Sequence, residues 1–144
     1  MIIKSPQTRD EFFAYYDLRW RVLRAPWNQP KGSEQDDLEG QAIHIIAVEV
    51  DRIVGCGRAH FNTDDEAQIR YMAVEKDWQG KGVGKLILNE LERRIIEKGA
   101  KKIILHAREN VVKFYEKAGY KIVKPSHTLF GSIPHFLMVK TIER

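Results

Sequence analysis

Residues 71–88, YMAVEKDWQGKGVGKLIL, constrain the fold most, because a β-rich run passes through a short turn into a glycine-rich helix start. At such a junction the free backbone N–H groups and the positive end of the helix dipole point at one place. That place attracts anions. We therefore expect a phosphorylated ligand to bind there.

Two common phosphate-binding motifs do not fit these residues. A P-loop requires GxxxxGK followed by Ser or Thr, but Gln79 stands where the first glycine belongs, and Leu86 follows Lys85. A dinucleotide-binding fingerprint requires GxGxxG with an acidic residue about 20 positions further on. Ile87 replaces the third glycine and Ile104 stands at the acidic position, so the sequence predicts neither an ATPase loop nor a Rossmann domain.

Hydrophobic periodicity predicts two long helices, one capped by Thr8 or Asp10 and ending near residue 24, the other over residues 82–98. Residues 25–40 are too polar and too broken by Pro and Gly for a regular element, which predicts a long surface segment. The remaining predictions are a short helix over 110–118 and extended runs over 1–4, 42–50, 52–61, 67–74, 102–107, 120–124 and 134–142. This mixture predicts an α/β (α+β) fold in a single domain, residues 1–144, with both faces of the sheet covered.

Composition narrows the class of protein. Cys56, between two glycines, is the single cysteine and reads as a small buried strand residue, so we expect neither a disulfide nor a metal site. The longest apolar run covers only residues 12–16, and residues 1–10 lack the apolar stretch of a secretory signal. A net charge of +4 arises from basic residues interleaved with acids, the pattern of solvated surfaces. We expect a cytoplasmic protein that binds neither nucleic acid nor membranes.

With the P-loop and the dinucleotide fingerprint excluded, the glycine segment is described by the spacing Q-x-x-G-x-G, formed by Gln79, Gly82 and Gly84. It resembles the pyrophosphate loop of the GNAT superfamily of acyl-CoA N-acyltransferases. Residues 108–120, RENVVKFYEKAGY, resemble the later motif of that superfamily, in which a short helix carries an aromatic–Tyr pair and ends at a glycine. The stretches LRWRVLRAPW and IPHFLMVK are similar to a small bacterial and archaeal branch whose acceptors are poorly defined. The resemblance implies a mostly antiparallel sheet of six to seven strands with helices on both faces.

The resemblance also implies a reaction. Acetyl-CoA, as cosubstrate, would give its acetyl group directly to a primary amine of a small molecule or peptide in a ternary complex. Tyr115 takes the role of the general acid that protonates the departing thiolate. Pyrophosphate would lie on the glycine loop and pantetheine along the preceding strand, which implies as cofactor-binding residues Met72, Ala73, Val74, Gln79, Gly80, Lys81, Gly82, Val83, Gly84, Lys85 and Arg108. The resemblance is compatible with a monomer and with a homodimer.

The sequence leaves several candidates for the general base that takes a proton from the amine. Gln68 stands where some family members place a catalytic glutamate, and an amide cannot accept that proton. The alternatives are His60, His135, Glu66 or a chain of water molecules. The opposing functional reading is a non-catalytic acyl-CoA-binding or regulatory module, against which the presence of Tyr115 argues.

For the acceptor we expect a site between residues 27–39 and 133–138, the parts least explained by cofactor binding. Carboxylates beside an aromatic wall suit a cationic amine, and this segment supplies Trp27 with Glu34, Asp36, Asp37 and Glu39. The alternative is that these acids cap helices or solvate a loop.

Overall fold

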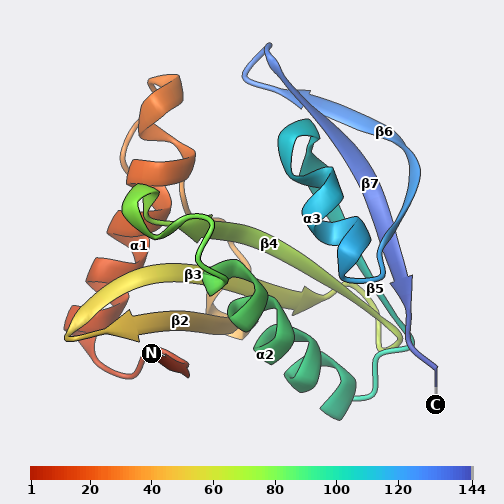
Figure 1. Ribbon diagram of the computed structural model, residues 1–144, viewed down its shortest axis with the longest axis horizontal. Helices are drawn as coiled ribbons and strands as arrows, with labels where there is room; N and C mark the ends of the chain where they lie inside the picture. Colours follow the sequence, from red (N-terminus) through yellow and green to blue (C-terminus); the bar gives the residue numbers. More distant parts are fainter. Residues whose placement is uncertain (144) are drawn as a thin grey trace.

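The computed structural model describes residues 1–143, which form one seven-stranded sheet flanked by helices (Figure 1). The strands are β1 (Ile2–Lys4), β2 (Ile43–Glu49), β3 (Arg52–Phe61), β4 (Glu66–Val74), β5 (Lys102–Arg108), β6 (Lys121–Leu129) and β7 (Ile133–Thr141). The helices are α1 (Arg9–Leu23), α2 (Val83–Glu97) and α3 (Val112–Lys117). The strand order is β1-β2-β3-β4-β5-β7-β6, and every neighbouring pair is antiparallel except β4–β5. The expected mixed, mostly antiparallel fold is confirmed.

Helix α1 begins at a capping box. The Thr8 hydroxyl accepts a hydrogen bond from the Glu11 backbone N–H at 3.1 Å, and the Glu11 carboxylate accepts one from the Thr8 N–H, also at 3.1 Å. Thr8, rather than Asp10, is therefore the cap. The buried side of α1 centres on Tyr15, which packs in one cluster with the fully buried Cys56 of β3.

Helix α2 covers the opposite face of the sheet. Its predicted apolar stripe of Ile87, Leu91 and Ile95 is fully buried. A Cβ atom at Gly57 of β3 would lie 2.8 Å from the Leu91 side chain, so only glycine lets the helix approach the strand this closely. No helix in residues 1–143 is long and apolar enough to span a membrane.

The C-terminal elements differ from the predicted boundaries. The extended run expected over 120–124 continues through Pro125 to the end of β6 at Leu129, with register shifts against β7. Because β6 is an edge strand, a proline can be tolerated there. The helix expected over 110–118 is split into a 3₁₀ turn, Glu109–Val111, followed by α3.

Strands β4 and β5 separate partway along their length. They pair in parallel only from Glu66 and Lys102 to Ile69 and Leu105. Beyond that point β5 continues against β7, while β4 continues against β3 alone. Figure 1 shows the two halves of the sheet diverging from this point. The β4 edge over residues 70–74 therefore has no strand partner on the β5 side.

Candidate active site

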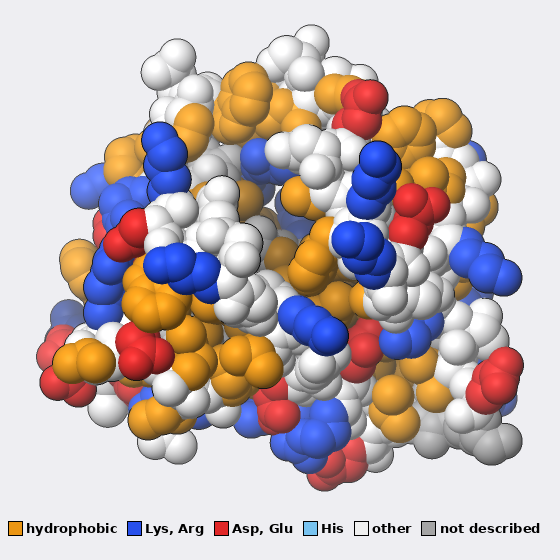
Figure 2. Space-filling view, in the orientation of Figure 1, with side chains coloured by type: hydrophobic (Ala, Val, Ile, Leu, Met, Phe, Trp, Pro, Cys, Tyr) orange, Lys and Arg blue, Asp and Glu red, His pale blue; other side chains and the backbone are white. Residues whose placement is uncertain are grey.

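A cavity of about 880 Å³ lies where β4 and β5 separate. Figure 2 shows the molecular surface hollowed between the two halves. The volume is in the range of small-molecule and cofactor sites. Nearly all of the predicted site residues line this cavity, namely Met72, Ala73, Val74, Gln79, Gly80, Gly82, Val83, Gly84, Lys85, Arg108 and Tyr115. Lys81 is the exception, and its ammonium lies 5.1 Å from the centre of the Trp78 ring.

The glycine loop has the backbone conformation that an anion cradle needs. Gly80 and Gly82 have φ angles of 76° and 86°, and no atom lies within 4 Å of the position that a Cβ would occupy on either. Gly82 precedes α2 without a side-chain cap, so the first-turn N–H groups of the helix are not satisfied by a capping side chain. The Gln79 amide donates a hydrogen bond to the Val74 carbonyl at 3.1 Å, which ties the loop to the end of β4.

Tyr115 is held rigidly with its hydroxyl free. The residue is 6% exposed, and its ring packs edge-to-face against Phe114 and Tyr120. Its hydroxyl makes no side-chain hydrogen bond within residues 1–143, and the oxygen is not fully enclosed by protein. Burial raises the pKa of Tyr115 above that of an ordinary phenol, so the side chain stays protonated near neutral pH. A protonated, cavity-lining hydroxyl is what a general acid requires.

Three histidines line the cavity from the C-terminal strands: His106 of β5, His127 of β6 and His135 of β7. The His127 and His135 rings stack at 4.5 Å between centroids, and His106 lies 5.3 Å from His127. His135 Nδ1 lies 2.9 Å from the Ile133 carbonyl. Because a carbonyl only accepts, Nδ1 carries the hydrogen and Nε2 keeps its lone pair. Burial lowers the pKa of His135 below 6.5, so its ring is neutral at pH 7.

The other expected bases lie elsewhere or are engaged. His60 accepts a hydrogen bond from Arg58 at 3.1 Å and bonds Asn62 through its other nitrogen at 3.1 Å, and it does not line the cavity. Glu66 accepts from Asn62 at 2.8 Å and is also absent from the lining. Gln68 does line the cavity, with its carbonyl oxygen bonded to the same asparagine at 3.1 Å. Of the expected bases, the structure brings only His135 to the cavity, while His106 and His127 were missed.

The expectation of an acidic acceptor wall is wrong. Asp36 and Glu39 are ion-paired with the fully buried Arg58 at 2.6 and 2.8 Å, and Glu39 also pairs with Arg19 at 2.7 Å. Partial burial acts to raise the pKa of Asp36. Hydrogen bonds from Arg58 and from a main-chain N–H, together with the charge of Arg58, outweigh this effect and lower the pKa to about 2. None of the four expected acids lines the cavity. Two of them neutralise buried arginines instead of facing a substrate.

Sequence reasoning also missed the cationic surroundings of Tyr71, which lines the cavity with an unusual φ of 58°. Four guanidinium groups approach its ring, with centroid distances of 3.8 Å for Arg19, 4.6 Å for Arg70, 4.8 Å for Arg58 and 5.5 Å for Arg24. Guanidinium groups at such distances are attracted by the ring face. Three of these groups are ion-paired with Asp36 or Glu39, and within residues 1–143 Arg24 alone has no salt bridge.

Arg24 and Arg108 meet at the end of α1. Each donates a hydrogen bond to the Leu23 carbonyl, at 3.2 and 3.4 Å, and Arg24 also donates to the Ser33 carbonyl at 3.0 Å. Neither guanidinium forms a salt bridge within residues 1–143. Burial, together with the charge of Arg24, lowers the pKa of Arg108. Two positive charges thus share one carbonyl, and no carboxylate of the described residues forms a salt bridge with either.

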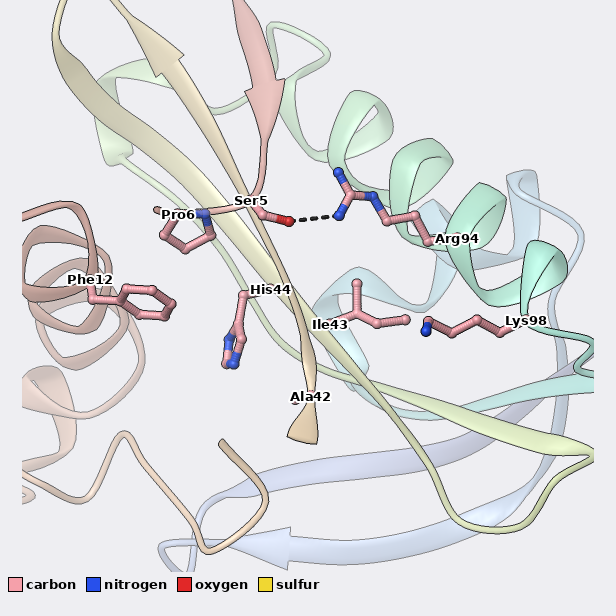
Figure 3. Close-up of a pocket in the computed structure, with 8 residues that line it drawn as sticks. All are labelled: Ser5, Pro6, Phe12, Ala42, Ile43, His44, Arg94 and Lys98. Atoms are coloured by element: carbon pink, nitrogen blue, oxygen red, sulfur yellow. Dashed lines mark hydrogen bonds between the residues drawn. The ribbon is translucent and has the colours of Figure 1, made fainter. Parts of the chain in front are cut away.

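A second hollow, of about 280 Å³, lies across the edge of β2 (Figure 3). Phe12 and His44 stand on one side of the strand, while Ile43 and Lys98 stand on the other. Both ring nitrogens of His44 are engaged, one with the Tyr15 hydroxyl at 2.8 Å and the other with a main-chain carbonyl at 2.7 Å. Within residues 1–143, no group of three His, Cys, Asp or Glu side chains is arranged to hold a metal ion. The larger cavity is therefore the candidate site.

This chain is similar to known acetyltransferases in sequence and in fold. The model of the acetyltransferase (GNAT) family matches residues 12–120. An uncharacterised N-acetyltransferase, YjcF of Bacillus subtilis (strain 168), is 32% identical over 93% of this chain and 92% of its own length. Among solved structures, an aminoglycoside 6'-N-acetyltransferase complexed with coenzyme A superposes with a TM-score of 0.83 at 23% identity, covering 100% and 99% of the two chains. A GNAT family acetyltransferase from Elizabethkingia anophelis with acetyl-CoA bound gives 0.79 at 19% identity, covering 98% and 97%.

Proposed function

Because this chain belongs to the acetyltransferase (GNAT) family, we propose that it transfers the acetyl group of acetyl-CoA to a primary amine, with both substrates in the cavity between β4 and β5. The observation that carries this proposal is the unpaired β4 edge followed, after one short turn, by an uncapped glycine helix start. An extended thioester cofactor whose pantetheine chain is joined to a pyrophosphate needs both features side by side.

The residues fit acetyl-CoA in two respects. Residues 72–74 offer main-chain hydrogen bonds on the side facing β5, where pantetheine can pair as an added strand. The loop from Gly80 to Gly84 offers the N–H groups of a helix start, with no side chain to prevent close approach of phosphate at Gly82. Lys85, which also lines the cavity, adds a positive charge next to that loop.

Acetyl-CoA supplies an acetyl thioester as the electrophile. His135 Nε2 takes a proton from the bound ammonium group, and the neutral amine then forms the C–N bond as the C–S bond breaks. The Tyr115 hydroxyl gives its proton to the departing thiolate. The acylated nitrogen releases its second proton, which passes through solvent and restores the Tyr115 phenol. A backbone N–H near Val74 donates to the carbonyl oxygen while negative charge develops on it.

The structure offers support for these two roles. Tyr115 and His135 both line the cavity, one protonated and the other neutral at pH 7. The Val74 carbonyl is turned toward Gln79, and in an extended residue the N–H projects to the same side as the carbonyl.

The alternative, a non-catalytic acyl-CoA-binding or regulatory module, would need the loop and the β4 edge but no free acid or base. The unbonded Tyr115 hydroxyl favours the enzyme. For cellular location we keep the cytoplasm as a proposal, since the chain's one cysteine is a buried free thiol, Cys56.

The test is incubation with acetyl-CoA and a broad set of primary amines, following free thiol and acetylated product together. An enzyme releases one thiol per acetylated amine, faster than the protein-free reaction. A non-catalytic module binds acetyl-CoA, detected by calorimetry, yet leaves both products at the spontaneous rate.

A further inference from the structure

The charged groups that line the cavity are all positive. They are Arg24, Arg70, Lys85 and Arg108, and no Asp or Glu belongs to the lining within residues 1–143. Figure 2 shows Lys and Arg side chains within the recess. An aqueous cleft lined by one sign of charge concentrates ligands of the other sign.

These four cations are not equivalent. Lys85 lies beside the glycine loop, where the cofactor's pyrophosphate is expected. Arg70 is already paired with Asp36 at 3.0 Å. Arg24 and Arg108 remain, without a salt bridge in the described chain and bonded to the same Leu23 carbonyl.

The lack of a paired carboxylate matters most for Arg24, because its side chain is buried. Arg24 is only 7% exposed. A buried charge without a partner is costly, and two like charges in close proximity increase that cost. The neighbouring Arg19 and Arg58, by contrast, are each ion-paired with a carboxylate. The fold thus supplies counter-charges to buried arginines nearby and leaves this pair open to the cavity.

Two neighbours place the pair in the cavity. The Arg24 guanidinium lies 5.5 Å from the ring centre of Tyr71, the residue that precedes the stretch of β4, residues 72–74, expected to pair with pantetheine. Arg108 is paired in register with His135 across β5 and β7. The two guanidinium groups therefore lie on the side of the cavity that holds the proposed base.

We propose that the acceptor is an amine that also carries a carboxylate, such as a free amino acid, and that Arg24 and Arg108 bind this carboxylate while His135 faces the amine. This inference rests on the proposed acetyl transfer and names its substrate class. It moves Arg108 from the cofactor to the acceptor. Polycationic amines, such as those acetylated by the structurally similar aminoglycoside 6'-N-acetyltransferase, are repelled by this lining.

The experiment uses acceptors in pairs that share an amine and differ at the carboxylate. L-Leucine, L-phenylalanine, β-alanine and 4-aminobutyrate are each compared with the corresponding carboxamide, and kanamycin serves as a polycation. The amine of an α-carboxamide is less basic than that of the acid, so more of it is neutral at pH 7.5 and the intrinsic bias favours the amide. A preference for the α-amino acids must then come from the protein.

We expect at least one acid of the set to be acetylated with a kcat/KM roughly 10- to 100-fold above that of its amide, the range for a charge-assisted hydrogen bond. Arg24→Gln should raise KM for the acid at least 10-fold, with a much smaller effect on the amide and none on acetyl-CoA affinity. Arg24→Lys should restore part of the preference. Arg108→Gln provides a second variant should Arg24→Gln fail to fold. The exposed Arg93→Gln on α2, paired only with Glu90 and Glu97, is the charge-matched control.

The outcomes separate this inference from the proposed function. If calorimetry detects no binding of acetyl-CoA, both the proposed acetyl transfer and the proposed acceptor class are wrong. If acetyl-CoA binds but an amide or kanamycin is acetylated as well as any acid, or no acid is acetylated above the spontaneous rate, the acceptor class is wrong. Weakened acetyl-CoA binding by Arg24→Gln would assign this arginine to the cofactor and overturn the inference as well.

Discussion

Tyr115 and Tyr120 lie edge-to-face, with 5.8 Å between their ring centroids, but only one of the two hydroxyl groups is hydrogen-bonded. Tyr120 donates a hydrogen bond to the Glu92 carboxylate at 2.7 Å, in the core beneath α2. Tyr115 has no such partner within residues 1–143 and borders the cavity. Two tyrosines five positions apart therefore serve as a structural anchor and as the proposed acid, which makes them a natural pair of test and control.

Tyr115→Phe should lower kcat by roughly 10²- to 10⁴-fold, the range for a lost proton donor, and leave acetyl-CoA affinity unchanged. Tyr120→Phe should do the reverse. It removes a buried hydrogen bond to a charged group, so it should lower the free energy of unfolding by about 1.5–3 kcal/mol with little change in kcat at temperatures where the protein is folded. Steady-state kinetics and thermal unfolding of both variants provide the measurement. Equal kcat values for Tyr115→Phe and wild type would reduce Tyr115 to a packing residue.

Gly82→Glu should abolish the stabilisation that acetyl-CoA gives. A ligand at about 100 times its Kd stabilises the native state by about 2.7 kcal/mol, which corresponds to a shift in Tm of roughly 5–11 °C for a chain of this length. A carboxylate on the loop would fill and charge the phosphate site. Gly99→Glu is the matched control, because Gly99 also has a positive φ and open space but lies at the other end of α2. A full ligand-induced shift in Gly82→Glu would disprove the loop assignment.

The parts of the fold that the sequence predicted well are those determined locally. The α2 stripe of Ile87, Leu91 and Ile95 repeats at helical spacing, and Thr8, one of the two expected caps, lies next to the helix that it caps. The extension of β6 through Pro125 was not predictable in this way, because it depends on pairing with β7 through irregular register. Local pattern carries no information about which strand lies beside which.

His135 should impose a pH dependence on kcat. Its pKa is lowered by burial from 6.5, so the neutral base is already dominant at pH 7, and kcat should fall only at a pH below 6.5. His135→Gln should reduce kcat and lose this acidic limb. Because the folded-state pKa is below the unfolded one, the unfolded chain binds the proton more readily and His135 also contributes to loss of stability as pH falls below 6.5. A pH profile of kcat from pH 5 to 9 is the measurement, and an identical acidic limb in the variant would exclude His135 as the base.

Asp36→Asn should destabilise the protein without changing the chemistry. It weakens the ion pairs of Asp36 with the fully buried Arg58 and with Arg70, while Glu39 still pairs with Arg58. We expect a loss of about 1–3 kcal/mol in the free energy of unfolding. Asp37→Asn, at an exposed neighbour, should stay within about 0.5 kcal/mol of wild type. Thermal unfolding checks both, and a changed acceptor KM with unchanged stability in Asp36→Asn would return this carboxylate to the acceptor site.

The candidate site was predictable in part for the same physical reason as the fold. The glycine loop and Tyr115 belong to short motifs, so their positions followed from sequence alone. Asp36 and Glu39 were wrongly assigned, since their partners Arg19 and Arg58 lie in α1 and β3, about 20 residues away. The histidine cluster depends on β5, β6 and β7 lying in one sheet, a long-range arrangement that residue spacing does not show.

The most direct test of the proposed acetyl transfer is a crystal structure of this protein with acetyl-CoA. We expect the pyrophosphate on the N–H groups from Gly80 to Gly84, pantetheine paired with the β4 edge at residues 72–74, and the thioester sulfur within hydrogen-bond distance of the Tyr115 hydroxyl. Arg24 and Arg108 should remain free of the cofactor. A cofactor bound outside the cavity between β4 and β5, or a thioester out of reach of Tyr115, would contradict it.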